Sequence, residues 1–209
     1  MGDAVDAVRT AWIDHVAVDE TLLDRLLVRH RERHRRYHTI DHVAAVVGHV
    51  ATLARSEAID DVGAVVAAAL FHDAVYEPSS PANERASARL ARRDLAALGW
   101  ASDRIERVAT MIEGTATHLD PADVDTAVLF DADLAILGAP EPVYVAYVDA
   151  VRAEYRHVDD ETWTTGRAGV LRTFLERDPL YATDTGRTTW EHSARRNLAD
   201  EIASLATGG

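Results

Sequence analysis

The sequence predicts an all-helical protein, built as a single irregular helical bundle. Along most of the 209-residue chain, apolar residues recur every three or four positions, which is the spacing of one face of an α-helix. The alternation of apolar and polar residues that marks strands is scarce, whereas the helix-favouring residues alanine, leucine and arginine are abundant. No low-complexity linker or internal repeat interrupts the chain, so we expect residues 1–209 to form one domain.

The first half of the chain predicts five helices. Side-chain oxygens that can cap a helix precede four of them, at Asp19, Thr39, Asp61 and Ser80, and Gly99 ends the fourth. Pro81 fits the first position of that fourth helix. The expected ranges are 22–33, 40–54, 62–75, 81–98 and 102–114. The third of these helices is apolar on every face until its last turn, which is typical of a buried helix.

The second half predicts four more helices. Asp120-Pro121 opens one that ends at Gly138, with Pro140 just beyond. The other three are expected at 142–157, 160–176 and 187–205. The longest irregular stretches, 115–120 and 178–186, are too short to indicate a second domain.

Composition excludes several classes of function. The net charge of -13 disfavours broad nucleic-acid binding and membrane-surface binding, because both partners are anionic. All 22 cationic residues are arginine, so no lysine can form a Schiff base or a P-loop. With no cysteine, a metal site has to use histidine and carboxylate ligands. The first residues have no leader-like apolar run and no stretch reaches the length of a membrane span, so we expect a cytoplasmic protein.

Charged residues interrupt apolar sequence at two places. His72-Asp73 ends the apolar run that begins at Val65, and an ionised carboxylate buried there needs a cation or an ion-pair partner. An Asp–Arg or Asp–His pair that closes the helix is the simpler interpretation of this dipeptide. Asp131 and Asp133 interrupt a later apolar helix, and only one of them can face the same centre as His72, because residues two apart do not share a helical face.

A third signal is a histidine-rich approach that ends at His42, in the first turn of the second helix. Together the three signals place imidazoles and carboxylates on three helices, which is how a helical bundle surrounds a divalent cation. Each signal alone also fits a purely structural role. The donor set accepts several ions, namely Mn, Mg, Co, Ni, Fe or Zn.

The ordered pattern resembles the HD superfamily, whose metal motif is H…HD…D on an all-helical fold. The resemblance implies that His42, His72, Asp73 and Asp133 are metal ligands. Asp133 is preferred to Asp131 because a short apolar stretch ending in Gly138 follows it.

The chain is more closely similar to bacterial HD proteins described as predicted metal-dependent phosphohydrolases. The stretches that carry this similarity are 36–42, 71–76, 83–88, 131–138 and 152–155, so the motif-bearing core spans 36–155. The resemblance implies a hydrolase that cleaves a small phosphate ester, with a nucleotide as one option.

Two groups of residues complete the expected site. Asp73, Glu77 and Glu84 are the candidates for catalysis, Glu77 also being a plausible surface residue at the start of a loop. The residues expected to bind the phosphorylated substrate are Arg36, His38, His118, Arg152 and Tyr155.

Two other classes of function stay open at this point. One is a mixed-valent di-iron oxygenase on the HD fold, for which His38, His118 and Asp131 could supply further ligands. The other is a non-catalytic, metal-stabilised ligand-binding domain. The sequence predicts no particular oligomeric state.

Overall fold

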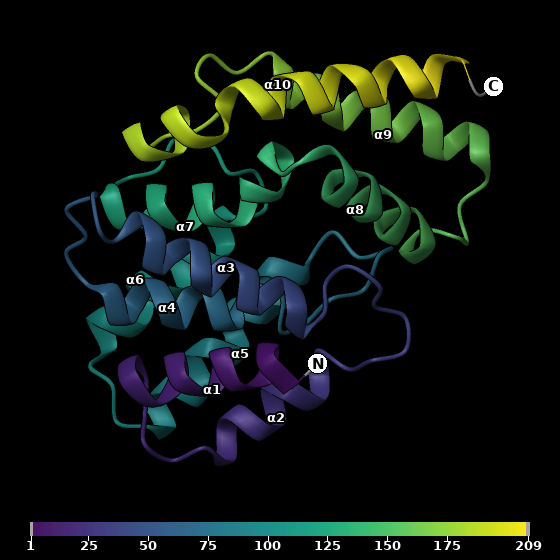
Figure 1. Ribbon diagram of the computed structural model, residues 1–209. Coiled ribbons are helices and arrows are strands. Elements are labelled where there is room, and N and C mark those ends of the chain that lie inside the picture. The colour runs from purple at the N-terminus through teal and green to yellow at the C-terminus, as the bar shows by residue number, and fades with distance from the viewer. Residues whose placement is uncertain (1, 208–209) are drawn as a thin grey trace.

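The computed structural model describes residues 2–207, and all of the regular secondary structure there is helical (Figure 1). The all-helical prediction is therefore confirmed. In chain order the helices are α1 (Gly2–His15), α2 (Thr21–Arg29), α3 (Ile40–Leu53), α4 (Val62–Phe71), α5 (Asn83–Ala97), α6 (Ser102–Gly114), α7 (Val124–Leu134), the 3₁₀ turn η1 (Ala135–Gly138), α8 (Glu141–Glu154), α9 (Asp160–Leu175) and α10 (Asp184–Thr207).

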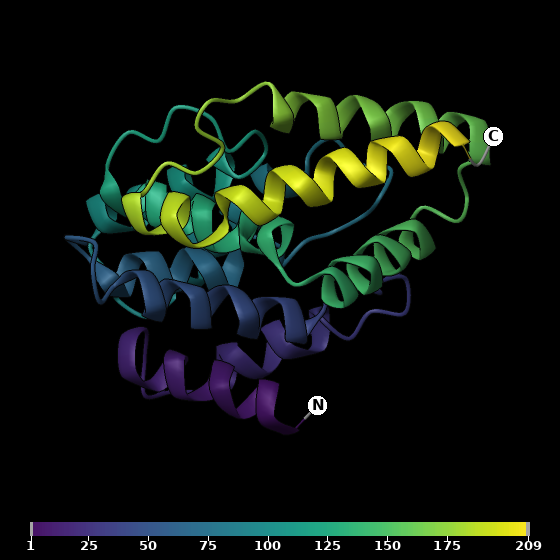
Figure 2. The same cartoon turned by 45° about the horizontal axis from the view of Figure 1, so that its top comes forward.

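The helices are stacked so that α3, α4 and α7 occupy the middle of the molecule (Figure 1). Helix α3 packs against α1, α4 and α7, while α5 and α6 pack against α4. Helices α9 and α10 lie side by side at the end remote from α1, as the turned view shows (Figure 2). From Ala64 to Phe71, every residue of α4 is buried, so this apolar helix is the centre of the core.

The beginnings of α3 and α4 follow the sequence closely. The Thr39 side chain accepts a hydrogen bond from the N–H of Asp41, and the Asp61 side chain accepts one from Ala64. Both residues are the predicted caps. Helix α6 has the predicted bounds, and Gly99 adopts the left-handed conformation, with φ of +79°, that favours glycine after a helix.

The end of α4 differs from the prediction, because the helix stops at Phe71 and not near Val75. The buried guanidinium of Arg35 donates to the carbonyl oxygens of Asp73 and His38, at 2.8 and 2.9 Å. The carbonyl of Asp73, just beyond α4, thus accepts from a side chain in place of a helical N–H, which favours the turn after His72.

Other predicted bounds are also wrong: α8 ends at Glu154 and not near His157, and α10 starts at Asp184 and not at Arg187. Helix α2 ends at Arg29 instead of continuing to Arg33, because the side chains of His30 and Arg35 turn into the interior. Helix α7 starts at Val124, since Asp123 rather than Asp120 caps it. Helix α5 starts at Asn83, two residues after the expected proline.

Helix α1 was not predicted. It buries Val8, Ala11 and Trp12 against the middle of the molecule, a stripe too short to stand out in the sequence.

Within residues 2–207, no single helix is both long enough and apolar enough to cross a membrane. The stretch Val124–Gly138 and α8 reach that length and composition only as a pair, and the chain bends by 103° between them.

Candidate metal centre

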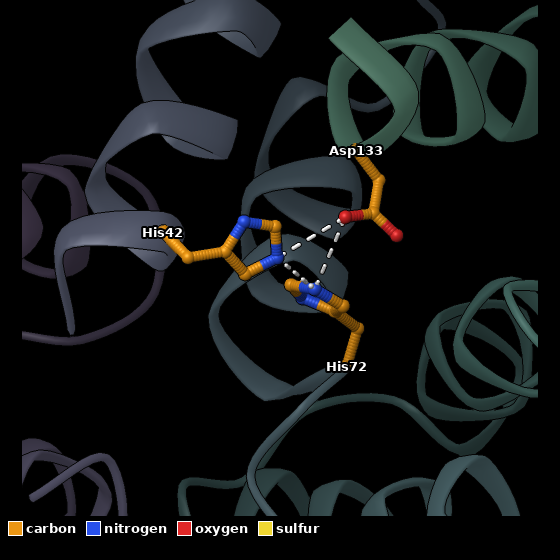
Figure 3. A group of neighbouring side chains, drawn as sticks. All are labelled: His42, His72 and Asp133. Atoms are coloured by element: carbon orange, nitrogen blue, oxygen red, sulfur yellow. Dashed lines mark hydrogen bonds and ion pairs between the residues drawn. The ribbon is translucent and has the colours of Figure 1, made fainter. Parts of the chain in front are cut away.

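Three side chains from α3, the end of α4 and α7 point toward one another (Figure 3). His42 comes from the first turn of α3, His72 follows the last residue of α4, and Asp133 lies near the end of α7. The Nε2 atoms of the two histidines are 3.1 Å apart. Oδ1 of Asp133 lies 3.2 Å from Nε2 of His42 and 3.5 Å from Nε2 of His72. All three donor atoms lie within 4.8 Å of one another, so one ion could contact them together.

Asp73 brings a fourth donor to the same point. Its Oδ2 atom lies 3.1 Å from Nε2 of His72 and 3.4 Å from Nε2 of His42. Side chains of consecutive residues within a helix diverge by about 100°. His72 and Asp73 lie in the turn that follows Phe71, and Oδ2 of Asp73 nevertheless comes within 3.1 Å of Nε2 of His72.

The hydrogen bonds of His72 show that this donor set fits a cation. Its Nδ1 atom lies 2.8 Å from the carbonyl oxygen of Ala69, so Nδ1 carries the proton and Nε2 of the neutral ring has a lone pair. That lone pair faces Nε2 of His42 and two carboxylate oxygens. Four electron-rich atoms in a buried position need a shared positive charge, and a His/carboxylate set of this kind is what borderline divalent metals take.

The charges at the cluster lead to the same conclusion. Burial by itself lowers the pKa of His42 and of His72, yet the adjacent carboxylates of Asp73 and Asp133 raise both pKa values, that of His72 well above its ordinary value. The same imidazoles hold the pKa of both carboxyl groups well below the usual range, against the effect of burial. Without a metal, protons therefore supply the positive charge that the site requires.

Asp131 lies only two residues from Asp133 but belongs to a different network. Its carboxylate accepts hydrogen bonds from the backbone N–H groups of Ala182 and Thr183 and from the Thr183 hydroxyl, at 2.7 to 2.8 Å. Gly186 permits this approach, since a Cβ there would lie 2.5 Å from Oδ2 of Asp131. Of the two aspartates left open by the sequence, Asp133 is thus the one beside the histidines.

His118 contacts the remaining oxygen of Asp133. Its Nε2 atom lies 2.8 Å from Oδ2 of Asp133, so it orients the carboxylate that faces the two imidazoles. The backbone at His118 is left-handed, with φ of 52°, and the Arg177 guanidinium holds the carbonyls of Thr117 and His118. A strained conformation held by its surroundings is a feature of functional sites.

Two cavities meet at this cluster, and His42 and Asp133 line both. The larger, of about 620 Å³, is called the aromatic cavity. Its defining residues are Tyr37, His38, Tyr76, His118, Tyr147, Tyr155, Trp163, Arg167 and Phe174. The smaller, of about 530 Å³, is called the alanine cavity, and its defining residues are Ala45, Ala132, Ala135, Ala139, Ala146 and Ala150.

His38 lines the aromatic cavity and is held by a buried carboxylate. Its Nδ1 atom lies 2.7 Å from Oε2 of Glu154, and Oε1 of Glu154 accepts hydrogen bonds from the backbone N–H groups of Arg36, Tyr37 and His38. The Tyr76 hydroxyl donates to the same carboxylate. Burial alone would raise the pKa of Glu154, but His38 and these backbone donors lower it to about 2. Glu154 therefore fixes the ring of His38 and places the proton on Nδ1.

The predicted site residues divide into two groups. Glu84, His38, His118 and Tyr155 line the aromatic cavity together with the four candidate ligands. Glu77 does not, because its backbone is paired with the side chain of Asn83 and its own side chain is exposed. The catalytic role expected for Glu77 has no support in this geometry.

Two of the predicted arginines also lie away from the aromatic cavity. Arg152 donates to the carbonyls of Tyr155 and Val158 and to Asp160, so it holds the connection between α8 and α9. Arg36 is exposed, lines the alanine cavity and donates to backbone carbonyls of its own turn. Neither arginine is positioned to bind a phosphate in the aromatic cavity.

Two functional candidates were missed in the sequence. Glu154 lies between Arg152 and Tyr155 in one of the family-like stretches, but nothing local distinguishes it from a surface acid. Arg167 lies in α9, outside the motif-bearing core, and its role depends on contacts with α8 and α10. No pattern within α9 could have revealed those contacts.

Comparison with known proteins finds no matching family model, no matching curated protein and no matching solved structure.

Proposed function

We propose that the protein is a metal-dependent phosphohydrolase of the HD type, which cleaves a small phosphate ester. One observation carries the proposal: two imidazole nitrogens and two carboxylate oxygens, from the ends of three helices, converge in the wall of a 620 Å³ cavity. The order of these residues, His42, His72-Asp73 and Asp133, is the order of the HD motif. The negative net charge of the chain does not prevent an anionic substrate from binding here. The attraction to a cation at the cluster exceeds the repulsion from distant, solvent-screened surface carboxylates.

Bound at the cluster, a divalent cation would polarise a phosphoryl oxygen and lower the pKa of an attacking water. His42, His72, Asp73 and Asp133 would hold it. His118 would keep Asp133 in place through the bond to its second oxygen.

His38 is the best-placed group for the proton transfers. Glu154 holds its Nδ1–H, and Nε2 of His38 has no hydrogen-bond partner among residues 2–207. Its ring is also stacked on Tyr76, with centroids 4.1 Å apart, so it has little freedom to turn. In the hydrolysis, water adds to phosphorus and the ester P–O bond breaks, while Nε2 of His38 takes a proton from the attacking water and passes it to the departing alkoxide. The products are an alcohol and inorganic phosphate. Glu84, which lines the same cavity, is the alternative proton carrier.

The test is hydrolysis of p-nitrophenyl phosphate by the protein freed of metal and then supplied with Mn, Co, Ni or Mg. We expect activity only with added metal. Replacement of Asp73 by Asn should lower the rate at least about 100-fold, because it removes a charged ligand. The matched control is Asp103→Asn, which changes an exposed aspartate of α6 and should leave the rate within twofold.

Full activity of the Asp73→Asn protein at normal metal content would refute the proposed site. The count of metal ions by elemental analysis separates the other classes. Two irons per chain with iron-dependent O₂ uptake would favour the oxygenase alternative. A metal-dependent rise in melting temperature without turnover of any phosphoester would favour a ligand-binding domain.

A further inference from the structure

Arg167 is the one arginine that lines the aromatic cavity, among the residues that the structure describes. It belongs to the face of α9 that also contributes Trp163, Val170 and Phe174 to the cavity wall. The spacing of three or four residues keeps these side chains on one side of the helix. The others are apolar or aromatic, so Arg167 is the single cationic group on this face of the cavity.

Contacts with two other helices hold the guanidinium of Arg167. Nε and Nη2 donate to the two oxygens of Glu201 in α10, at 2.8 and 3.1 Å. Nη2 also lies 3.2 Å from the hydroxyl of Tyr147 in α8. The side chains of Arg167 and Glu201 are only 9% and 6% exposed, so the pair is fixed in place before any ligand arrives.

The third nitrogen of this guanidinium is unused. Nη1 of Arg167 has no hydrogen-bond acceptor within residues 2–207, and it is not fully buried. It is therefore an accessible donor on a charged group in a lined cavity.

Glu201 leaves Nη1 of Arg167 free to donate, because its carboxylate accepts from Nε and Nη2 and from the Tyr144 hydroxyl. A cationic donor with an open N–H in a largely apolar wall favours an oxyanion, which it binds by a charge-assisted hydrogen bond.

The arginine and the metal cluster lie at separate points of one cavity. The ring of Tyr147 contacts that of Tyr37, with centroids 4.7 Å apart, and Tyr37 contacts the ring of His42 at 4.8 Å. Contacts thus lead from the guanidinium through two tyrosine rings to His42. A molecule that extends along the cavity wall with an anion at each end can contact both points.

We propose that Arg167 forms a second anion subsite, so that the substrate carries a carboxylate or phosphate in addition to the phosphoryl group at the metal cluster. This inference rests on the proposed function only for the phosphoryl group at the metal cluster. The subsite selects substrates with two anionic ends, such as phosphorylated acids or bisphosphorylated metabolites, over simple monoesters.

The test measures binding rather than turnover, by calorimetric titration of the Mn²⁺-loaded protein. The probes are three series of phosphonates of increasing chain length: alkylphosphonates, ω-carboxyalkylphosphonates and α,ω-bisphosphonates. We expect one chain length at which a second anion tightens binding about tenfold over the alkyl compound, as for one charge-assisted hydrogen bond. If the ω-carboxyalkylphosphonates gain more affinity, the second group is a carboxylate. If the α,ω-bisphosphonates gain more affinity, it is a phosphate.

The variant that removes the subsite is the double substitution Arg167→Gln with Glu201→Gln, which leaves no unpaired charge behind. It should abolish the tenfold advantage and leave alkylphosphonate binding unchanged. The matched control is Arg92→Gln with Glu106→Gln, which removes a bidentate ion pair between α5 and α6 that does not line the cavity and should retain the advantage. If the double variant does not fold, the single substitution Arg167→Gln, whose amide can still hydrogen-bond to Glu201, should have the same effect.

The outcomes separate the two proposals. If alkylphosphonates bind but no second anion helps at any length, the subsite is refuted and the phosphohydrolase proposal stands. An advantage that survives in the Arg167/Glu201 protein also refutes the subsite. If no phosphonate binds to protein shown to contain Mn²⁺, both proposals fail.

Discussion

Asp131 and Asp133 lie two residues apart in α7, yet the surroundings of their carboxylates are opposite in kind. Asp131 faces the beginning of α10, where two backbone N–H groups and a hydroxyl donate to it. Asp133 faces His42 and His72, whose Nε2 atoms offer lone pairs as readily as protons. One carboxylate has all the donors it needs, and the other lies among groups that need a shared cation.

The pKa values express the same difference. Burial raises the pKa of Asp131 above its ordinary value, because its hydrogen bonds only partly offset the loss of solvent. For Asp133 burial acts in the same direction, but the imidazoles of His72, His118 and His42 lower the pKa well below the usual range. Burial of an acid therefore does not identify a functional site. The nature of the groups around it does.

The largest effect should follow from Asp133→Asn. The amide keeps the size of the side chain and removes the charge, so we expect Mn²⁺ affinity to fall at least about 100-fold. Calorimetric titration of the metal-free protein measures this affinity, and circular dichroism checks that the helices are retained. Normal affinity in this protein, together with a loss in an Asp131 variant, would show that the sequence pattern had selected the wrong aspartate.

Substitution of Asp131 by Ala should instead lower stability. It leaves the N–H groups of Ala182 and Thr183 buried without an acceptor, at a cost of about 3 kcal/mol. For a chain of this size the melting temperature should fall by roughly 6 to 12 °C. Metal bound per folded chain should not change. If Asp131→Ala reduced the Mn²⁺ stoichiometry without lowering the melting temperature, the division between the two networks would be incorrect.

The sequence predicted what depends on local patterns. Helical periodicity gave the all-helical class, and single capping residues gave the starts of α3 and α4. The four residues now found at the cluster were also predicted. His72, Asp73 and Asp133 interrupt apolar sequence, and all four, with His42, occur in the order of a known motif. Metal binding at that cluster stays a prediction.

What the sequence did not predict depends on contacts between distant segments. The turn that follows α4 is held by Arg35, which lies 38 residues before Asp73 in the chain. The carboxylate that holds His38 comes from Glu154 in α8, and Arg167 is positioned by Glu201 in α10. Long-range hydrogen bonds of this kind leave no periodic pattern in the chain.

His30 extends the comparison to a buried group that has no partner. It is 2% exposed, as is His72, but neither of its ring nitrogens has a hydrogen bond within residues 2–207. Burial, with a contribution from Arg35, lowers the pKa of His30 from 6.5 to about 3. His72 and His30 are thus equally buried and shifted in opposite directions, and the carboxylates beside His72 account for the difference.

The smallest of these effects is a pH dependence due to His30. Its folded pKa lies below the unfolded value of 6.5, so the unfolded chain binds the extra proton. The contribution of neutral His30 to stability is complete above pH 6.5 and declines as the pH falls toward 3. At pH 5 this lowers the free energy of unfolding by about 2 kcal/mol relative to pH 7.5.

Replacement of His30 by Leu should remove that decline, because leucine fills a similar space and cannot bind a proton. Urea unfolding at pH 7.5 and pH 5 measures the difference, with His192→Gln as a control at an exposed histidine of α10. A His30→Leu protein that lost as much stability at pH 5 as the unsubstituted protein would mean that His30 gains a partner, such as a buried water, when it is protonated. In that case a buried histidine without a protein partner would not have to be neutral. The opposite pKa shifts of His30 and His72 would then reflect buried water rather than the carboxylates beside His72.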